Sequence, residues 1–291
     1  MTGTVDVTTG ALVARRPVGA YHALSIAAPA IAANAAPGQF VSVGVDAADT
    51  VLRRPFAIAG VDTGAGTIEL VMAVVGAGTA WLASRPVSTP LDIVGPLGTS
   101  FVPPERPARC LLVGGGYGVA PLAWSASRLA AGGNAVELLN GARTASVLYP
   151  VAPRPGQVTI HEVTQDGSRG ATGLVTDALR ARLADHPGQH DGTPTVVHAC
   201  GPMPMLVAVA GVCAAHDVAC QVAVEEHMGC SIGVCMTCVV PTVAGNVRSC
   251  IDGPVLDAAR IEWTSVLGRR SGPTARATST NRGDHAGSGR P

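Results

Sequence analysis

Four cysteines near the C-terminal end constrain the fold and chemistry of this chain more than any other feature of its sequence. They are Cys230, Cys235, Cys238 and Cys250, so four, two and eleven residues separate successive members. This is the plant-type spacing of ligands for one [2Fe–2S] cluster, in which three thiolates share a short loop and the fourth returns later. The spacing therefore predicts a one-electron carrier with these four cysteines as metal ligands.

Two other uses of four cysteines remain as alternatives. A disulfide framework is typical of small secreted domains, whereas this chain has 291 residues and we expect no signal segment at its start. A structural zinc site usually pairs two CxxC-like knuckles, and here the fourth cysteine stands alone. The remaining cysteines lie in apolar runs and are expected to pack as small buried hydrophobes. They are Cys110, Cys200, Cys213 and Cys220.

Composition excludes several other classes of protein. Hydrophobic residues make up 47% of the chain and charged residues 14%, enough to fill the cores of two or three domains. Twenty basic residues balance twenty acidic ones and only 3% are aromatic, which argues against nucleic-acid binding. Every basic residue is arginine, which excludes a P-loop lysine. No apolar stretch reaches the roughly 20 residues of a membrane span, and we expect a cytoplasmic protein.

The pattern of apolar residues changes along the chain. Over residues 1–103, short β-branched stretches are separated by turns, which predicts an antiparallel β barrel. After a proline-rich linker, strand-like and helical runs alternate, which predicts a parallel-sheet α/β domain over 107–222. Its predicted strands cover 110–113, 135–139, 158–163, 195–200 and 219–224, and its predicted helices cover 119–131, 172–184 and 203–215.

The C-terminal part is predicted to divide into two segments. Residues 223–267 contain the four cysteines and are predicted to form a small [2Fe–2S] domain. Residues 268–291 are rich in Ser, Thr, Gly and Arg without apolar periodicity, which predicts a disordered tail.

Two loops of the predicted parallel sheet indicate a dinucleotide site. Each lies between a strand and a helix, where glycine lets the backbone approach a phosphate and the helix N-terminus offers free amides. The first loop contains Gly114, Gly115, Gly116 and Gly118, and the second is Cys200-Gly201-Pro202. Neither is the GxGxxG fingerprint, and one such turn is often only structural. Two in one sheet, at its carboxyl edge, favour nucleotide binding.

The barrel region contains two further candidate phosphate contacts. Arg53 and Arg54 lie on a predicted strand, where their guanidinium groups can bind a phosphate bidentately, although exposed arginine is also common. About twenty residues later, Gly76, Gly78 and Thr79 precede a short helical run whose amides can hold a phosphate. Together these features predict a flavin-binding barrel.

Several motifs follow one another in one order: RRPFAI, VVGAGT, GPLGTSF, GGGYGVAPL, ACGPMP and the four-cysteine loop. In this order the chain resembles the ferredoxin-reductase-like flavoproteins, and most closely the electron transfer subunits of type B dihydroorotate dehydrogenase. The resemblance covers about residues 5 to 267 and includes CIDGPVLDAARIEW, which begins at the fourth cysteine. It implies FAD and a [2Fe–2S] cluster as cofactors and NAD as a diffusible substrate.

The resemblance also implies roles for residues at matching positions. For FAD these are Arg54, Pro55, Phe56, Ala57, Val71, Met72, Ala73, Gly78 and Thr79, with Arg54 on the pyrophosphate. For NAD they are Gly114, Gly115, Gly116, Gly118, Cys200, Gly201 and Pro202. Two positions depart from the family's pattern. Ala57 replaces a serine or threonine that can hydrogen-bond the flavin, and Ser231 replaces a glycine, which makes a positive φ costly there.

The implied function is electron transfer in pyrimidine biosynthesis. Electrons from dihydroorotate would reach FMN in a separate catalytic subunit, cross the cluster and FAD, and leave to NAD+ as hydride. The sequence offers no site for a carbon substrate and no required acid–base residue, so the chain is predicted to be half of an enzyme. The implied assembly is a heterotetramer of two catalytic and two electron transfer subunits. Ile232, Val234 and Met236 beside the ligands would either dock the partner or shield the cluster.

Other functions of the same core remain as alternatives. The core could serve a sulfide dehydrogenase, a hydrogenase diaphorase subunit or a ferredoxin:NADP oxidoreductase. A non-enzymatic redox sensor is a different class of function, but it has no use for two dinucleotide-type loops. Arg143, after the second predicted sheet strand, could meet the 2′-phosphate of NADP, whereas the resemblance implies NAD.

Overall fold

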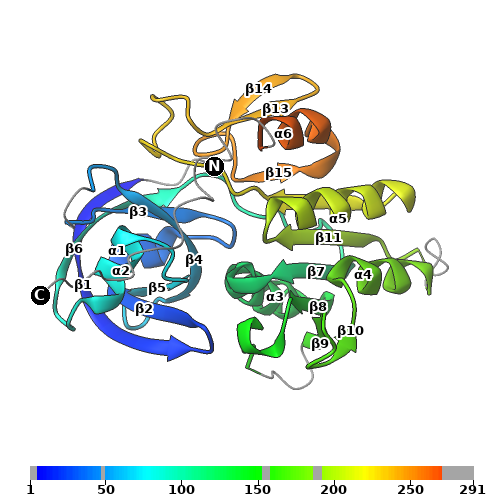
Figure 1. Ribbon diagram of the computed structural model, residues 1–291, viewed down its shortest axis with the longest axis horizontal. Coiled ribbons are helices and arrows are strands. Elements are labelled where there is room, and N and C mark those ends of the chain that lie inside the picture. Colours follow the sequence, from blue (N-terminus) through cyan, green and yellow to red (C-terminus); the bar gives the residue numbers. More distant parts are fainter. Residues whose placement is uncertain (1–4, 47–49, 153–157, 186–191, 271–291) are drawn as a thin grey trace, which may run out of the picture.

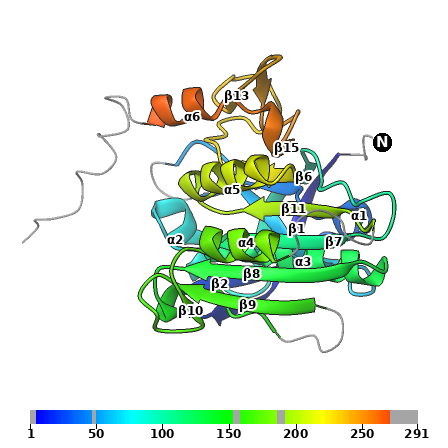
Figure 2. The ribbon, with the colours of Figure 1, turned by 90° about the vertical axis from the view of Figure 1, so that its right-hand side faces the viewer.

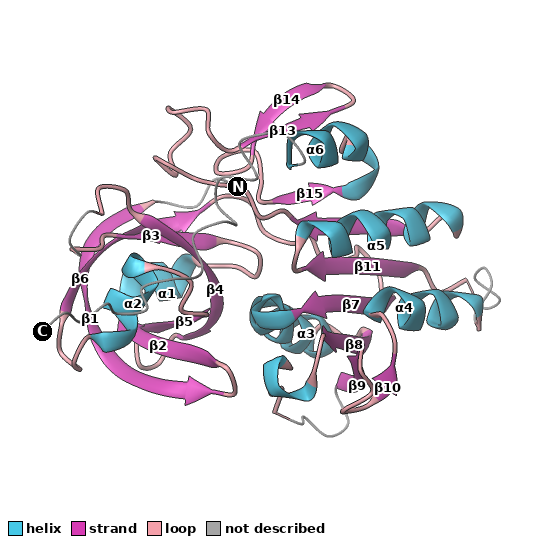
Figure 3. Cartoon of the chain, viewed as in Figure 1, coloured by secondary structure: helices cyan, strands magenta, loops and turns pink. Residues whose placement is uncertain are grey.

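The chain folds into a β barrel, an α/β sheet domain and a small C-terminal part that lies above both (Figure 1). The computed structural model describes residues 5–46, 50–152, 158–185 and 192–270. Strands and helices alternate along the second domain, whereas the first is mostly strand (Figure 3). The predicted combination of antiparallel barrel, parallel-sheet domain and C-terminal iron–sulfur part is confirmed for the fold class. The domain boundaries themselves stay a prediction.

The barrel is closed and its neighbouring strands pair antiparallel in the order β1-β2-β5-β4-β3-β6. Alternate side chains of these strands point inward and form one apolar core with residues such as Leu24, Ile58 and Leu70. The elements are β1 (Asp6–Val18), β2 (Tyr21–Ala27), α1 (Pro29–Asn34), β3 (Phe40–Val43), β4 (Arg54–Asp62), β5 (Thr67–Met72), α2 (Ala77–Ser84) and β6 (Pro90–Leu97).

The second domain is a seven-stranded sheet in the order β10-β9-β8-β7-β11-β12-β15. Its strands are parallel except β15, which pairs antiparallel with β12. The strands are β7 (Arg109–Gly115), β8 (Ala135–Ala142), β9 (Val158–Thr164), β10 (Ala171–Thr172), β11 (Thr195–Cys200), β12 (Ala219–Ala223) and β15 (Val255–Asp257). The helices are α3 (Val119–Ala131), α4 (Val175–Ala184) and α5 (Met203–Ala215), with short 3-10 turns η1 (Gly116–Gly118) and η2 (Ala145–Val147).

Helix α3 covers the sheet face that turns toward the barrel, and α4 and α5 cover the other face (Figures 1 and 2). The core under α3 is continuous with the barrel wall, because Tyr21 and Val71 of the barrel pack in one cluster with Val119 and Leu122. The strand order reverses at β7 and β11, which places the ends of these two strands at a topological switch point. Ligands of open α/β sheets bind at such points.

The C-terminal part differs from the prediction in two respects. It contains the hairpin β13 (Val239–Thr242) and β14 (Gly245–Arg248), then η3 (Ala258–Arg260) and α6 (Trp263–Arg270). Strand β15 lies within the predicted cluster segment yet extends the sheet of the α/β domain, because its backbone pairs with the free edge of β12. Helix α6 continues to Arg270, past the predicted start of the tail at 268. Residues 271–291 lie outside the described residues.

The helices of the described ranges are short. The longest, α3 and α5, have 13 residues each. None of the helices in these ranges has both the length and the apolar character needed to cross a membrane.

A charged network crosses the sheet beneath α4. Arg109 donates two hydrogen bonds to one carboxylate oxygen of Glu137, at 3.0 and 2.7 Å, and His161 Nε2 lies 3.0 Å from the other oxygen. Arg182 of α4 lies 3.4 Å from the same carboxylate and 3.1 Å from His161 Nδ1. Burial would raise the pKa of Glu137, but the bonds from Arg109 and then His161 outweigh it and lower the pKa.

We expect Glu137→Gln to lower the free energy of unfolding by about 1–3 kcal/mol at pH 7, because two arginines lose a half-buried charged partner. The folded-state pKa of Glu137 is lowered from its ordinary value of 4.5. The ionised carboxylate therefore contributes its full stabilisation to the fold above pH 4.5. This stabilisation disappears as the pH falls through the folded-state pKa. Urea denaturation of both proteins at pH 7 and at pH values below 4.5 measures the difference.

Glu162→Gln is the matched control, because its partner Arg169 has a side chain that is 60% exposed. Its expected cost is about 0–1 kcal/mol. If Glu137→Gln and Glu162→Gln lowered the free energy of unfolding equally at pH 7, the Glu137 network would stabilise the fold no more than an exposed ion pair does.

Candidate cofactor and electron-transfer site

The first two cysteines form one pair in a tight loop, in which Cys235 is hydrogen-bonded to the Cys230 side chain. The sulfur of Cys230 accepts hydrogen bonds from the backbone amides of Val234, at 3.3 Å, and Cys235, at 3.4 Å. Gly233 turns the loop with a φ of 81°, and a Cβ at this position would lie 2.7 Å from the side chain of Ile251. The loop therefore requires glycine here both for its backbone angle and for its packing.

The last two cysteines form a second pair. Their sulfur atoms lie 3.2 Å apart, and both side chains are buried. The β13–β14 hairpin brings them together, because the chain leaves at Cys238 and returns at Ser249, whose amide donates to the Cys238 carbonyl at 2.8 Å. The eleven residues between Cys238 and Cys250 thus contain one hairpin that brings the two cysteines together.

Two thiol pairs fit a [2Fe–2S] cluster better than one metal ion. A cluster of two irons with four cysteines takes two thiolates at each iron, whereas zinc needs four donors around one point. In the described ranges, no three His, Cys, Asp or Glu side chains converge as ligands of one ion. The hydroxyl of Ser249, next to Cys250, is fully buried and has no hydrogen-bond partner. Hydrogen-bond donors of this kind stabilise cluster sulfur atoms.

The thiols differ in acidity. Hydrogen bonds from Thr237 and then Cys230 lower the pKa of exposed Cys235 to about 6. Burial, and then the neighbouring Cys238, raise the pKa of Cys250 to about 12. A buried thiol of this kind ionises when a bound metal supplies positive charge, so cluster binding and deprotonation are coupled at Cys250.

The barrel wall contacts the cysteine pair directly. Phe40 of β3 and Leu97 of β6 form one buried apolar cluster with Cys238 and Cys250, and Met228 packs against it. No sequence pattern predicts this contact, because Phe40 and Leu97 have the pattern of ordinary barrel residues. The cysteine site therefore lies against strands β3 and β6 of the barrel wall.

The structure brings together two of the residues predicted to bind FAD phosphate. A Cβ on Gly78, in the first turn of α2, would lie 2.9 Å from Arg54 Nε at the start of β4. The Arg54 guanidinium bonds only backbone among the described residues, with its shortest contact 2.6 Å from the Leu52 carbonyl. The Thr79 hydroxyl accepts from the amides of Val75 and Gly76 at 2.9 and 3.1 Å, so it holds the loop.

Arg53 differs from the prediction that both arginines face a phosphate. It forms an ion pair with Asp92 and donates to the Ser42 and Asp92 carbonyls, both at 2.9 Å. The two arginines share no side-chain partner, because Arg54 bonds the Leu52 and Arg53 carbonyls instead. Arg53 belongs to the barrel structure.

The other predicted FAD residues lie along β4 and the end of β5. Pro55 and Phe56 are partly buried, and Ala57 is exposed. Val71 packs between the barrel and α3, whereas the Met72 side chain is in the barrel core, so only its backbone is available to a ligand. Ala73 is partly buried beyond the strand's end.

The two predicted NAD loops lie side by side at the switch point. A Cβ on Gly118 would lie 2.7 Å from the Cys200 carbonyl oxygen, and one on Gly201 would lie 3.0 Å from the Gly115 amide. A Cβ on Gly114 would lie 2.5 Å from the side chain of Val119, and Gly116 has a φ of 58°. These glycines are needed for loop packing whether or not a phosphate binds. Pro202 precedes helix α5 and closes the second loop.

A side-chain contact that sequence reasoning missed joins the first loop to the segment leading to the cluster. The Tyr117 hydroxyl donates to Glu225 at 3.1 Å. Burial, and then Glu225, raise the pKa of Tyr117. Burial likewise raises the pKa of Cys200 to about 12, with Glu225 adding to it. Both side chains are neutral near pH 7, so neither adds a charge to the first nucleotide loop.

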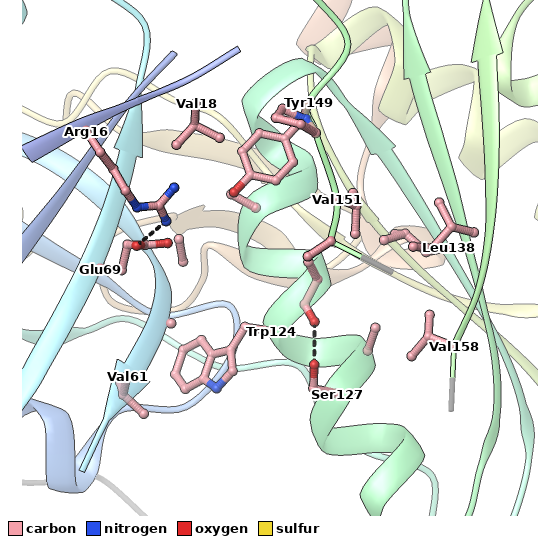
Figure 4. A pocket seen from close by; sticks show the side chains of 18 residues that line it. Arg16, Val18, Val61, Glu69, Trp124, Ser127, Leu138, Tyr149, Val151 and Val158 are labelled. Carbon is pink, nitrogen blue, oxygen red and sulfur yellow. Dashed lines mark hydrogen bonds and ion pairs between the residues drawn. The ribbon is translucent and has the colours of Figure 1, made fainter. Parts of the chain in front are cut away.

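A separate cavity of about 410 Å³ lies between the barrel and the α/β domain (Figure 4). Val61 and Trp124 line it on one side, and an ion pair between Arg16 and Glu69, at 2.7 Å, lies near Tyr149 (Figure 4). None of the residues predicted to bind FAD or NAD lines it. It lies toward the end of β4, whereas Arg54 begins that strand.

Comparisons with known proteins agree with this geometry. Residues 225–262 match the family described as the iron–sulfur cluster binding domain of dihydroorotate dehydrogenase B. A solved structure of an NADH-dependent reduced ferredoxin-NADP oxidoreductase is 26% identical, with a TM-score of 0.80 over 96% of this chain and 98% of that chain. A carbazole 1,9a-dioxygenase ferredoxin reductase shares the fold, with a TM-score of 0.63 and 22% identity over 75% of this chain and 68% of its own.

Fold and site thus define a ferredoxin-reductase-like oxidoreductase chain that carries an iron–sulfur domain. Proteins named as the electron transfer subunit of dihydroorotate dehydrogenase B (NAD(+)) are still more similar in sequence. Those of Shouchella clausii and Bacillus caldolyticus are 35% and 37% identical, each over 77% of this chain and 86% of the relative. The chain belongs to this family.

Proposed function

We propose that this chain passes electrons to NAD+ for a dihydroorotate dehydrogenase whose catalytic subunit contains FMN. The observation that carries the proposal is the packing of Cys238 and Cys250 on Phe40 of β3, the barrel strand paired with Arg54–Ala57, together with the two nucleotide loops at the switch point. When bound, FAD exchanges a hydride with NAD and single electrons with an iron–sulfur cluster. No side chain of this chain has to transfer a proton to a carbon substrate.

The residues divide this work by position. Arg54 and the first turn of α2 hold the FAD pyrophosphate, and the strand segment from Pro55 to Ala57 lies along the flavin. The loops around Gly114–Gly118 and Cys200–Pro202 bind NAD, and the four cysteines hold the cluster. The neutral Cys200 and Tyr117 side chains line the nicotinamide side without adding charge.

The partner binds at the cysteine loop. Ile232, Val234 and Met236 are 55%, 74% and 55% exposed and lie within three residues of the exposed Cys235 along the chain. Three exposed apolar side chains beside an electron-transfer group are typical of a docking surface. We assign it to the FMN-containing catalytic subunit, in a cytoplasmic heterotetramer of two catalytic and two electron transfer subunits.

A second candidate is an electron transfer chain of a ferredoxin:NADP oxidoreductase complex. The observation that favours it is the TM-score of 0.80 with the structure of an NADH-dependent enzyme of that class. Exposed Arg143 directly after β8 is placed to meet a 2′-phosphate. The higher identity to the dihydroorotate relatives favours the first candidate.

The test combines the purified chain with an FMN-containing dihydroorotate dehydrogenase subunit. We expect FAD and about two irons per chain, NADH-dependent dye reduction by the chain alone, and dihydroorotate-dependent NAD+ reduction only by the complex. Faster reduction by NADPH, or no complex with that subunit, would favour the second candidate.

Val234→Asp tests the docking surface. A charge in an apolar interface should weaken assembly about tenfold or more, measured by titration of one subunit with the other. Val243→Asp is the matched control, because Val243 is 68% exposed but lies at the tip of the β13–β14 hairpin. NADH-dependent dye reduction should be unchanged in both variants.

A further inference from the structure

Ser231 follows the first ligand cysteine, Cys230, and has a positive φ, the backbone conformation that is costly for a residue other than glycine. Its φ is 63°, in the left-handed region where residues with a Cβ are disfavoured. The side chain is 1% exposed, so this conformation is not a mobile surface turn. A residue held this way inside a structure needs compensating contacts around it.

The compensating contact comes from the barrel. The Ser42 hydroxyl of β3, itself 1% exposed, donates to the Ser231 hydroxyl at 3.2 Å. The two residues are 189 positions apart in the chain. Replacing either hydroxyl alone would leave the other buried without this partner, which costs more than the bond itself contributes.

Ser42 is fixed from the barrel side as well. Its carbonyl accepts a hydrogen bond from Arg53 at 2.9 Å, and Arg53 is in turn paired with Asp92. In the strand register Ser42 lies opposite Pro55, one residue from Arg54. The hydroxyl pair thus connects the cysteine loop to the strand that carries the proposed FAD contacts.

The other side of the cysteine site is anchored separately. The Thr99 amide donates to the Gly253 carbonyl at 2.6 Å, and the Thr99 hydroxyl donates to the Val255 carbonyl at 2.9 Å. These bonds hold the segment after Cys250. The Ser42–Ser231 bond acts on the loop that carries Cys230 and Cys235.

We propose that Ser42 and Ser231 are positioning residues whose buried hydroxyl pair fixes the first cysteine loop on the flavin-binding barrel. The pair sets how firmly the cluster is held and how well it is placed to exchange electrons with the flavin. This inference rests on the proposed FAD and cluster sites. It explains why serine occupies a position where the backbone favours glycine.

The test uses Ser42→Ala, Ser231→Ala and the double variant in the full chain. Ser42→Ala leaves the cysteine loop unchanged in sequence, so any effect on the cluster is transmitted through the bond. We expect chelator-driven loss of cluster absorbance to be about threefold to tenfold faster in each single variant. The double variant should lose its cluster no faster than the faster of the two single variants, because both substitutions remove the same interaction.

Stopped-flow reduction by NADH supplies a readout that a purely structural role would not change. The rate of flavin reduction should be unchanged in the serine variants. The later reduction of the cluster should be about threefold to tenfold slower. Ser125→Ala is the control, since it removes a buried hydroxyl from α3, remote from the cysteine loop. If Ser231→Ala fails to fold, Ser231→Gly removes the same hydroxyl while relieving the positive φ.

Three outcomes separate the possibilities. A Ser42→Ala protein that matches Ser125→Ala in both measurements overturns the inference and leaves the proposed function intact. Multiplicative effects in the double variant also overturn it, because the hydroxyls would then act independently. An unmodified chain without iron or flavin overturns both the inference and the proposed function.

Discussion

Replacing Cys235 by serine will remove the iron–sulfur cluster and leave the flavin bound. The four cysteines lie in two pairs, Cys230 with Cys235 and Cys238 with Cys250. A cluster bound by them has two thiolates at each iron, so the loss of Cys235 removes one of two ligands at one iron. Serine keeps the size of the side chain but offers a hydroxyl that ionises far less readily than the thiol. Because Cys235 is exposed, the substitution does not disturb a packed core.

Iron content should fall from about two per chain to near zero, and the visible absorbance of the cluster should disappear. FAD content and NADH-dependent dye reduction should be retained, because the proposed FAD and NAD contacts lie on the barrel and on the sheet edge. Dihydroorotate-dependent NAD+ reduction by the complex should be lost. Iron analysis and optical spectra of the purified protein make the measurement.

Cys110→Ala is the control for this prediction. Cys110 is also a free cysteine, but it is buried in the core under α3 and belongs to neither pair. This variant should lose some stability, as expected for a buried side chain made smaller, and should keep its iron. Full iron retention in Cys235→Ser would show that Cys235 is not a ligand.

The sequence predicted the α/β domain closely because its strands are buried on both faces. Such strands are continuous apolar runs bounded by glycine, so 195–200 was predicted with its observed bounds, as were the helices at 119–131 and 203–215. The ends of β7, β8, β9 and β12 differ from the prediction by one to three residues, and α4 begins at Val175, not 172. Residues 171–172 pair with β9 as a short strand, and Gly173 then turns with a φ of 130°.

The parts that sequence could not supply are contacts between distant segments. Strand β15 is only three residues long, and nothing local shows that it completes the sheet beside β12. Phe40 and Ser42 lie on one barrel strand, and their contacts with the cysteine loop depend on how two domains meet. The pattern of apolar residues along a sequence indicates which residues are buried and whether they lie on a strand or a helix. It does not indicate which distant residues they contact.

The candidate site shows the same division. Motif spacing placed the four cysteines, Arg54 and Gly78, and the structure brings Arg54 and Gly78 into contact. The local pattern alone could not separate Arg53 from Arg54, because adjacent arginines carry identical local signals, and only the resemblance assigned the pyrophosphate to Arg54. The glycines of the nucleotide loops were attributed to phosphate approach, whereas their neighbours in the other loop also require them.

Arg54→Gln will weaken FAD binding by about tenfold to a hundredfold, whereas Arg53→Gln will leave it nearly unchanged. In our proposal the Arg54 guanidinium binds the FAD pyrophosphate through charge-assisted hydrogen bonds, each worth about 1.5–3 kcal/mol. Glutamine keeps part of the length and polarity but loses the charge. Arg53 is committed to Asp92 and Ser42 within the barrel, so its loss should instead lower the free energy of unfolding.

The two variants change neighbouring residues, Arg53 just before β4 and Arg54 at its start, so the comparison separates cofactor binding from stability. Titration of the flavin-free chains with FAD, followed by the quenching of flavin fluorescence, gives the two dissociation constants, and thermal unfolding gives the stabilities. Gly78→Ala should also weaken binding, because its Cβ would lie 2.9 Å from Arg54 Nε and displace the guanidinium. Equal FAD affinities for Arg53→Gln and Arg54→Gln would contradict the assignment of Arg54, since only one of the two guanidinium groups is free of an ion pair within the described part of the chain.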